Sequence, residues 1–184
     1  FSIPSPYQVA IFINENGLSY ARENLNDYNK ASTYGTSFSS AANLGVYGSN
    51  MAYITLYDQT RDAMNYFSVI KMLAEKLELL AAFDKQTITR IENNISNKDS
   101  LMMILGNTYR NADAYFKNSQ REHLACLVLA GGWVESMHLL VSFDNVDSKS
   151  VKKRIGENKK PLDNLIQLLA PHAENSDDYK KLLA

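Results

Sequence analysis

The chain has little cysteine, proline and histidine, and the shortage of each limits what the protein is able to do. Its 184 residues include one cysteine, four prolines and three histidines. A single cysteine excludes an intrachain disulfide, so cysteine pairing gives no information about the compartment. That residue, Cys126, lies inside an apolar run, where a thiol is inert. We therefore interpret Cys126 as part of the core.

No charge of one sign is in excess. Lysine and arginine number 19 and the acids 20, which leaves a net charge of −1. This balance gives no electrostatic argument for a nucleic-acid partner, and we expect none. One dense basic cluster lies between residues 149 and 160, and on a single helix it predicts a solvated face rather than a binding site. Its members are Lys149, Lys152, Lys153, Arg154, Lys159 and Lys160.

No apolar run reaches the roughly 20 residues that a membrane-spanning helix needs, so we expect no transmembrane span. The longest uncharged apolar stretch, LACLVLAGGWV at 124–134, predicts the middle of a buried helix over 120–143 that is surrounded on every face. Ser119 and Glu122 have the spacing of a capping box at its start. We expect Trp133 to pack in the core that this helix organises.

The remaining segments have helical spacing, and none shows the alternation and turn signals of β-hairpins. Three local signals set helix starts: Ser5 before Pro6, Asp84 in a staple formed by Phe83 and Ile88, and the pair Ser96 and Asp99 as a capping box. Proline predicts a kink or fresh start near Lys160, before Pro161, and a stop at Pro171. The predicted helices cover 6–14, 36–57, 60–80, 84–95, 97–117, 120–143 and 148–169, with a short one within 175–184.

Two of these helices contain glycine in their interiors, at a cost of about 1 kcal/mol for each glycine relative to alanine. Gly45 and Gly48 lie on one strip of the helix over 36–57, and Gly131 and Gly132 are adjacent in the central helix. Small residues of this kind predict that the two helices cross with their backbones close together. The alternative is that the glycines leave space for a ligand between helices.

Short connections between these helices favour antiparallel neighbours. The sequence therefore predicts an all-α fold, a mostly antiparallel multi-helix bundle around a buried central helix. We expect a single helical domain over 1–184, with an N-terminal wrapping segment at 1–35, a helical core at 36–170 and a C-terminal tail at 171–184.

A cluster of polar residues near the start of the helix over 60–80 is a candidate ligand-binding site. Helical spacing brings Asp62, Asn65 and Tyr66 onto one patch. Tyrosines with polar tips could line a pocket beside it, although helix capping and ordinary core tyrosines give the same pattern. The candidate residues are Asp62, Asn65, Tyr66, Tyr53 and Tyr57, with Tyr109 nearby.

Glu135 and His138 form the best candidate for metal chemistry, because a Glu-x-x-His pair places two ligands on one helix face. A di-iron site needs a second such pair, and neither His123 nor His172 has a glutamate three residues before it. Three interpretations stay open: a single metal with one remote carboxylate, a hydrogen-bonded polar pair, or a simple surface position. No phosphate loop, nucleophile elbow or zinc signature is present, and we expect no cofactor.

The stretches NLGVYGSNMAYITLYDQT, AMNYFSVIKMLAEKL, LVLAGGWVESMHLL and PLDNLIQLL carry a family resemblance. With them, most of 4–170 resembles an uncharacterised all-helical family of secreted or lipid-anchored proteins from Gram-negative bacteria. The resemblance implies an exported protein, periplasmic or held by a lipid anchor upstream of Phe1. It implies no reaction and no functional residues.

The leading hypothesis is a non-enzymatic helical envelope protein that acts as a binding or interaction module for a protein or small-molecule partner. The alternative is a small-molecule-binding protein or enzyme that uses a pocket between helices, with a single metal at Glu135 and His138.

Overall fold

The computed structural model describes residues 3–79, 85–142 and 148–184. Within these ranges the chain forms helices and no strand, and the helices pack as a mostly antiparallel bundle, as the sequence predicts. Two short 3₁₀ helices, η1 (Arg22–Asn24) and η2 (Tyr28–Thr33), precede the core. The α-helices are α1 (Pro6–Glu15), α2 (Ser37–Leu56), α3 (Thr60–Lys76), α4 (Lys85–Asn93), α5 (Lys98–Asn118), α6 (Glu122–Val141), α7 (Lys149–Glu157), α8 (Lys159–Ala173) and α9 (Asp177–Leu183).

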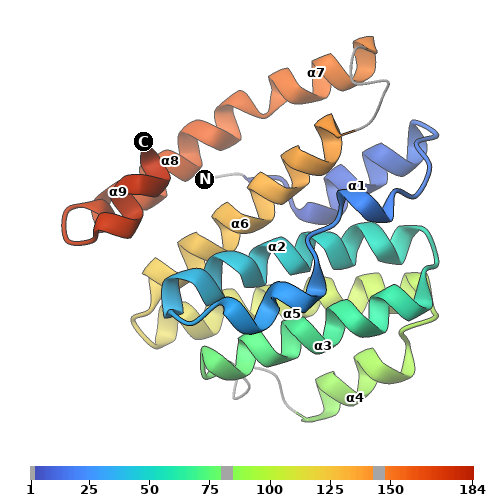
Figure 1. Ribbon diagram of the computed structural model, residues 1–184, viewed down its shortest axis with the longest axis horizontal. Helices are drawn as coiled ribbons and strands as arrows, with labels where there is room; N and C mark the ends of the chain where they lie inside the picture. Colours follow the sequence, from blue (N-terminus) through green and yellow to red (C-terminus); the bar gives the residue numbers. More distant parts are fainter. Residues whose placement is uncertain (1–2, 80–84, 143–147) are drawn as a thin grey trace.

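The helices are stacked from α4 at one edge of the molecule to α7, α8 and α9 at the opposite edge (Figure 1). Helices α2 and α6 lie between these edges and form the most extensive helix contact in the described residues. Helix α3 runs back along α2, and α1 packs against α2 and α6.

The contact between α2 and α6 depends on glycine. A Cβ atom on Gly45 would lie 2.0 Å from the carbonyl oxygen of Val128, and one on Gly131 would lie 1.8 Å from that of Ala42. No side chain fits at such distances, so the two backbones touch at these positions. The predicted crossing of small residues is confirmed, and the space at Gly45 and Gly131 is filled by the other helix instead of a ligand.

The helix surrounded on all sides is α2, not α6. Every residue from Tyr47 to Leu56 in α2 is buried. In α6, by contrast, Leu129 is 39% exposed, Val134 50% and Val141 46%. The prediction that 124–134 is buried on every face is therefore wrong, because α6 lies between α2 and α8 and its flanks reach solvent. Cys126 is buried, whereas Trp133 is only half-buried.

By length and composition, α6 is the one described helix that could cross a membrane. More than half of its apolar stretch is covered by other helices of the bundle. A core helix of a soluble protein passes the same test of length and composition.

The start of α1 follows the signal predicted at Ser5 and Pro6, and α2 begins one residue after the predicted start of its range at Thr36. The backbone N–H of Ser5 donates to the side chain of Gln8 at 3.0 Å, and Pro6 is the first residue of α1. At the start of α2, the Thr36 hydroxyl accepts from the backbone N–H of Ser39 at 3.0 Å. These bonds satisfy N–H groups that have no partner within the helix.

Two predicted capping boxes are wrong. The Ser119 hydroxyl donates to the carbonyl of Tyr115 at 2.8 Å, which places Ser119 at the end of α5, and α6 begins after Arg121 without a side-chain cap. Helix α5 is capped by Asn97, whose side-chain oxygen accepts from the N–H of Ser100 at 3.0 Å. The proposed cap and staple at Asp84 and Phe83 lie outside the described residues.

Proline acts as predicted at one position and not at the other. Helix α7 ends at Glu157 and α8 begins at Lys159, so Pro161 falls in the first turn of a new helix. Pro171 does not stop α8, which continues to Ala173. A proline this close to the end of a helix removes only one late backbone hydrogen bond.

Candidate functional site

Four of the five predicted ligand-binding residues, all except Asn65, make hydrogen bonds to a segment of the chain itself. Residues 18–34 are the part of the predicted 1–35 segment that lies across α2 and α3, and from here on this part alone is called the wrapping segment. It contains η1 and η2. This segment has little regular structure, so its backbone N–H and C=O groups need partners outside it. Tyrosine and asparagine side chains of α2 and α3 supply them.

Tyr53 and Tyr57 hold the beginning of the wrapping segment. The Tyr53 hydroxyl donates to the carbonyl oxygen of Ser19 at 3.2 Å and accepts from the N–H of Ala21 at 2.9 Å. The Tyr57 hydroxyl donates to the carbonyl oxygen of Leu18. Both polar tips are therefore engaged by backbone groups.

Three side chains hold the middle of the wrapping segment. Tyr66 donates to the carbonyl oxygen of Asn26 at 2.8 Å, and Tyr47 donates to that of Asp27 at 2.7 Å. The side-chain oxygen of Asn50 accepts from the N–H of Asn26 at 3.1 Å. Tyr47 and Asn50 were not among the predicted site residues, although they make the same kind of contact.

The tyrosine rings also pack on one another. Tyr53 lies 4.8 Å from Tyr57 and 5.5 Å from Tyr20, measured between ring centroids, and Tyr47 lies 5.8 Å from Tyr66. Burial raises the pKa of Tyr53 to about 12 and raises the pKa of Tyr47 and of Tyr66 above its ordinary value of 10.0. These hydroxyls stay protonated at neutral pH and act as hydrogen-bond donors.

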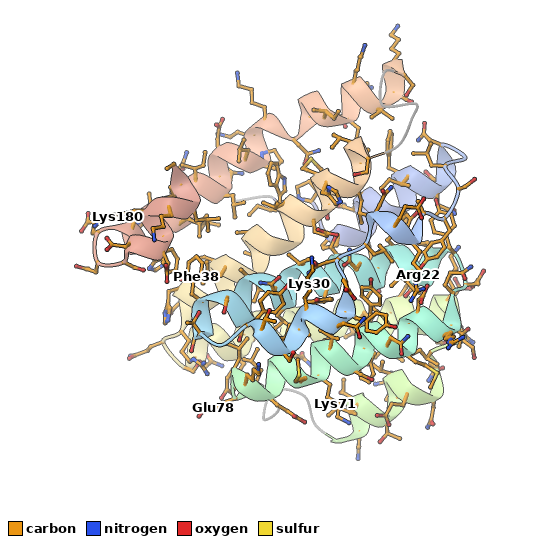
Figure 2. The ribbon with its side chains drawn as sticks, in the orientation of Figure 1. Arg22, Lys30, Phe38, Lys71, Glu78 and Lys180 are labelled. Atoms are coloured by element: carbon orange, nitrogen blue, oxygen red, sulfur yellow. The ribbon has the colours of Figure 1, made fainter. Side chains whose placement is uncertain are left out.

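Asp62 binds two residues of the wrapping segment. The Tyr20 hydroxyl donates to one carboxylate oxygen at 2.7 Å, and the Arg22 Nε lies 3.2 Å from the other. Figure 2 shows Arg22 near the end of the bundle where α3 begins. The Asp62 side chain is only 13% exposed, so both of its oxygens serve contacts within the chain.

Asn65 lies apart from Tyr53 and Tyr57, on a surface groove between η2 and α3. This groove has a volume of about 310 Å³ and is open to solvent. Its lining residues are Tyr28, Asn29, Ala31, Ser32, Asn65, Ser68, Val69 and Met72. The predicted residues therefore do not form one site, because Asn65 lines this groove whereas the other four bind the wrapping segment. The side chain of Tyr109 lies outside the described residues.

Glu135 and His138 also contact other parts of the chain. Glu135 is 7% exposed, and one of its oxygens accepts from the side-chain amide of Asn50 at 2.5 Å. Nε2 of His138 lies 3.0 Å from the carbonyl oxygen of Asn24. Because Asn50 also accepts from Asn26, the pair on α6 is linked to the wrapping segment at two points.

Burial raises the pKa of the Glu135 carboxyl group above its ordinary value of 4.5. The hydrogen bond from Asn50 and the positive charge of His138 oppose this shift but are smaller than the effect of burial. A buried carboxylate of this kind is a candidate for proton transfer or metal binding. Among the residues that the structure describes, no group of three histidine, cysteine, aspartate or glutamate side chains could hold a metal ion.

Local sequence patterns do not predict the network around Glu135. Ser49 and Ser136 are hydrogen-bonded at 2.8 Å across the contact between α2 and α6, and both are buried. Buried polar side chains are usually hydrogen-bonded, so the position of Asn50 within the apolar end of α2 indicates that it has a buried hydrogen-bond partner. Its partners lie 24 and 85 positions away in the sequence, where helical spacing carries no information.

The fold and these contacts define an all-α bundle in which Tyr53, Tyr57, Tyr66 and Asp62 bind the chain's own wrapping segment. Comparison of the chain with family models, with curated proteins and with solved structures finds no match.

Proposed function

We propose that the protein is a non-enzymatic interaction module and that its contact surface lies on α7 and α8, called here the arm. The arm packs on α6 and follows the outer edge of the molecule (Figure 1). The exposed side chains Ile155, Leu162 and Ile166 form what we call the arm surface.

The distribution of exposed apolar side chains carries this proposal. Among the described residues, nine large apolar side chains are exposed. Only Met64 and Met103 belong to the 121 residues before α6, and the other seven lie on α6 to α9. Single exposed apolar residues are normal, but their concentration on neighbouring helices is typical of an interaction surface. The seven are Leu129, Val134, Val141, Ile155, Leu162, Ile166 and Leu182.

The three residues of the arm surface face the same side. They are spaced by seven and four positions, which returns to one face of a helix. Asn158, between α7 and α8, keeps helical backbone angles, with φ −84° and ψ 0°, so the face continues from one helix to the next. Their exposed fractions are 37% for Ile155, 38% for Leu162 and 45% for Ile166.

A role without catalysis is supported by the contacts of the candidate site residues. Asp62, Tyr53, Tyr57 and Tyr66 bind the wrapping segment, and Glu135 binds Asn50. Polar groups engaged in this way stabilise the fold. The alternative, a small-molecule site, retains one supporting observation, the open groove beside Asn65.

The proposed location, in the periplasm or at the membrane through a lipid anchor, rests on the family resemblance alone. An exported protein, periplasmic or lipid-anchored, is recovered from the envelope fractions when the full-length gene is expressed in its own host. Recovery in the cytoplasmic fraction alone would count against an envelope protein.

Site-specific photo-crosslinking in the host tests the proposed surface. A photoreactive phenylalanine replaces Ile166 in one variant and Met103, which is 61% exposed on α5, in a matched control. We expect adducts from position 166 and none, or far fewer, from position 103. Equal yields at the two positions, or no adduct at position 166, would contradict an interaction surface on the arm.

A further inference from the structure

We infer that the arm surface docks on an anionic lipid surface. This inference rests on the proposed function and specifies the partner of the same surface. It combines two features of the arm, its exposed apolar side chains and its concentration of lysine.

Positive charge is concentrated on the arm although the whole chain carries a net charge of −1. Residues 149–160 contain six basic residues and one acid, Glu157. Arg154 faces inward, since its guanidinium donates to the carbonyl of Gln8 at 3.3 Å and lies 5.5 Å from the centre of the Phe12 ring. The basic residues that remain are exposed, and they are Lys149, Lys152, Lys153, Lys159 and Lys160.

Lysine and apolar side chains occupy adjacent strips of the arm. At about 100° per residue, Lys152 and Lys159 lie within about 60° of Ile155 around the helix axis. Buried residues such as Val151 and Leu165 lie on the other side of the apolar strip and face the bundle. Charge alone predicted a solvated face for this cluster, but the exposed apolar strip beside it changes that interpretation.

A basic amphipathic helix with a narrow aliphatic strip fits the interface of a bilayer. Aliphatic side chains enter the boundary of the acyl chains, while lysines bind anionic headgroups through long flexible stems. Each lysine near an anionic membrane contributes to binding through the surface potential. The acids Glu157 and Asp163 are also exposed on the arm, yet five exposed lysines outnumber them.

The arm surface is less suited to a protein partner. Protein interfaces depend mostly on aromatic and arginine side chains that fill pockets in the partner. The exposed strip contains only isoleucine and leucine, and the arginine of the arm is held by α1. A lipid surface needs no matching pocket, so it suits a flat aliphatic strip beside lysines.

Co-sedimentation with vesicles tests this inference. The intact protein is mixed with vesicles of equal parts phosphatidylglycerol and phosphatidylethanolamine, and separately with vesicles of phosphatidylcholine. We expect binding to the anionic vesicles that weakens with added salt, and little binding to the neutral ones. Absence of binding to the anionic vesicles, or equal binding to both, would overturn the inference.

Two variants separate the charged from the apolar contribution. The double variant Lys152→Gln/Lys159→Gln should bind anionic vesicles about 30-fold more weakly, because each lysine contributes a factor of about five to six. The control is the double variant Lys30→Gln/Lys71→Gln, which removes the same amount of charge. Figure 2 shows that Lys30 and Lys71 lie away from α7. Equal losses in the two double variants would refute a localised surface.

The second variant, Leu162→Ser/Ile166→Ser, should weaken binding by at least tenfold while Met103→Ser leaves it unchanged. All the substituted leucine, isoleucine and methionine residues are exposed, so each variant should fold, and circular dichroism checks this. The crosslinking experiment distinguishes two failures. Adducts to a protein at position 166 without vesicle binding overturn the lipid inference and leave the interaction module standing, whereas no adduct at position 166 to either protein or lipid contradicts both.

Discussion

The backbone of Gly45 in α2 lies against that of Val128 in α6, so closely that a Cβ on Gly45 would be 2.0 Å from the Val128 carbonyl oxygen. This contact brings the two central helices together and allows Ser49 to reach Ser136 and Asn50 to reach Glu135. The packing of small residues thus positions the buried polar network.

Replacing Gly131 with alanine should destabilise the protein strongly. The added methyl group would lie 1.8 Å from the Ala42 carbonyl oxygen, so the helices must separate, at a cost of about 3 kcal/mol or more. Gly106 in α5 is the matched control, because a Cβ there has no neighbour within 4 Å. Gly106→Ala should raise the free energy of unfolding by about 0.5 to 1 kcal/mol through helix propensity. Urea unfolding measures both, and equal effects would refute the close contact.

Removing the hydroxyl of Tyr66 should loosen the wrapping segment. Tyr66→Phe leaves the carbonyl of Asn26 without its donor, at a cost of about 1 to 3 kcal/mol. Tyr115→Phe serves as control, since that hydroxyl makes a long, exposed bond of 3.3 Å. Faster amide exchange near residue 26 in Tyr66→Phe alone is the expected result. Unchanged stability and exchange would instead assign Tyr66 a role outside the fold.

Helix positions were largely predictable from sequence, because capping and periodicity are local. Pro6 shows this, and so does the break before Pro161. Ser119 misled because serine also bonds to carbonyls in the preceding turn, where it ends a helix instead of starting one.

The roles of the candidate site residues were not predictable. Tyr53 and Tyr66 have polar tips in a buried setting, which fits a ligand pocket and a structural contact equally well. The deciding partners are backbone atoms of Ser19 and Asn26, which lie 34 and 40 positions away. The wrapping segment has no periodicity that places it across α2 and α3.

Glu135 should make stability depend on pH. Burial raises its folded-state pKa above the ordinary value of 4.5, so the folded protein holds the proton more tightly than the unfolded chain. Stability therefore falls as pH rises from the unfolded pKa through the raised folded pKa, and is constant above it. Glu135→Gln keeps the oxygen that accepts from Asn50 and has no charge to bury.

The free energy of unfolding of this variant should rise relative to that of the parent as pH increases from the ordinary carboxyl pKa of 4.5 through the raised folded-state pKa. Urea unfolding across that range measures the difference. A constant difference would show that Glu135 titrates normally, and a loss that grows with pH would show that its carboxylate form is stabilised instead.

Trp133 should hold the junction of the arm. Its indole N–H donates to the side-chain oxygen of Asn158 at 3.2 Å, and Asn158 joins α7 to α8. Trp133→Phe removes this bond and should cost about 1 kcal/mol, with faster amide exchange at residues 155–162. Because Trp133 is half-buried, Trp133→Ala should cost less than the roughly 3 to 5 kcal/mol of a fully buried tryptophan. Exchange unchanged along the arm would contradict this role.

Amide hydrogen exchange, measured with and without phosphatidylglycerol vesicles, tests most directly where the protein meets its partner. With vesicles bound, the account predicts slower exchange along the arm, at residues 149–166, and unchanged exchange in the wrapping segment and α3. Slower exchange in the wrapping segment or α3, with exchange along the arm unchanged, would place the binding site near Tyr53 and Tyr66 and contradict the account.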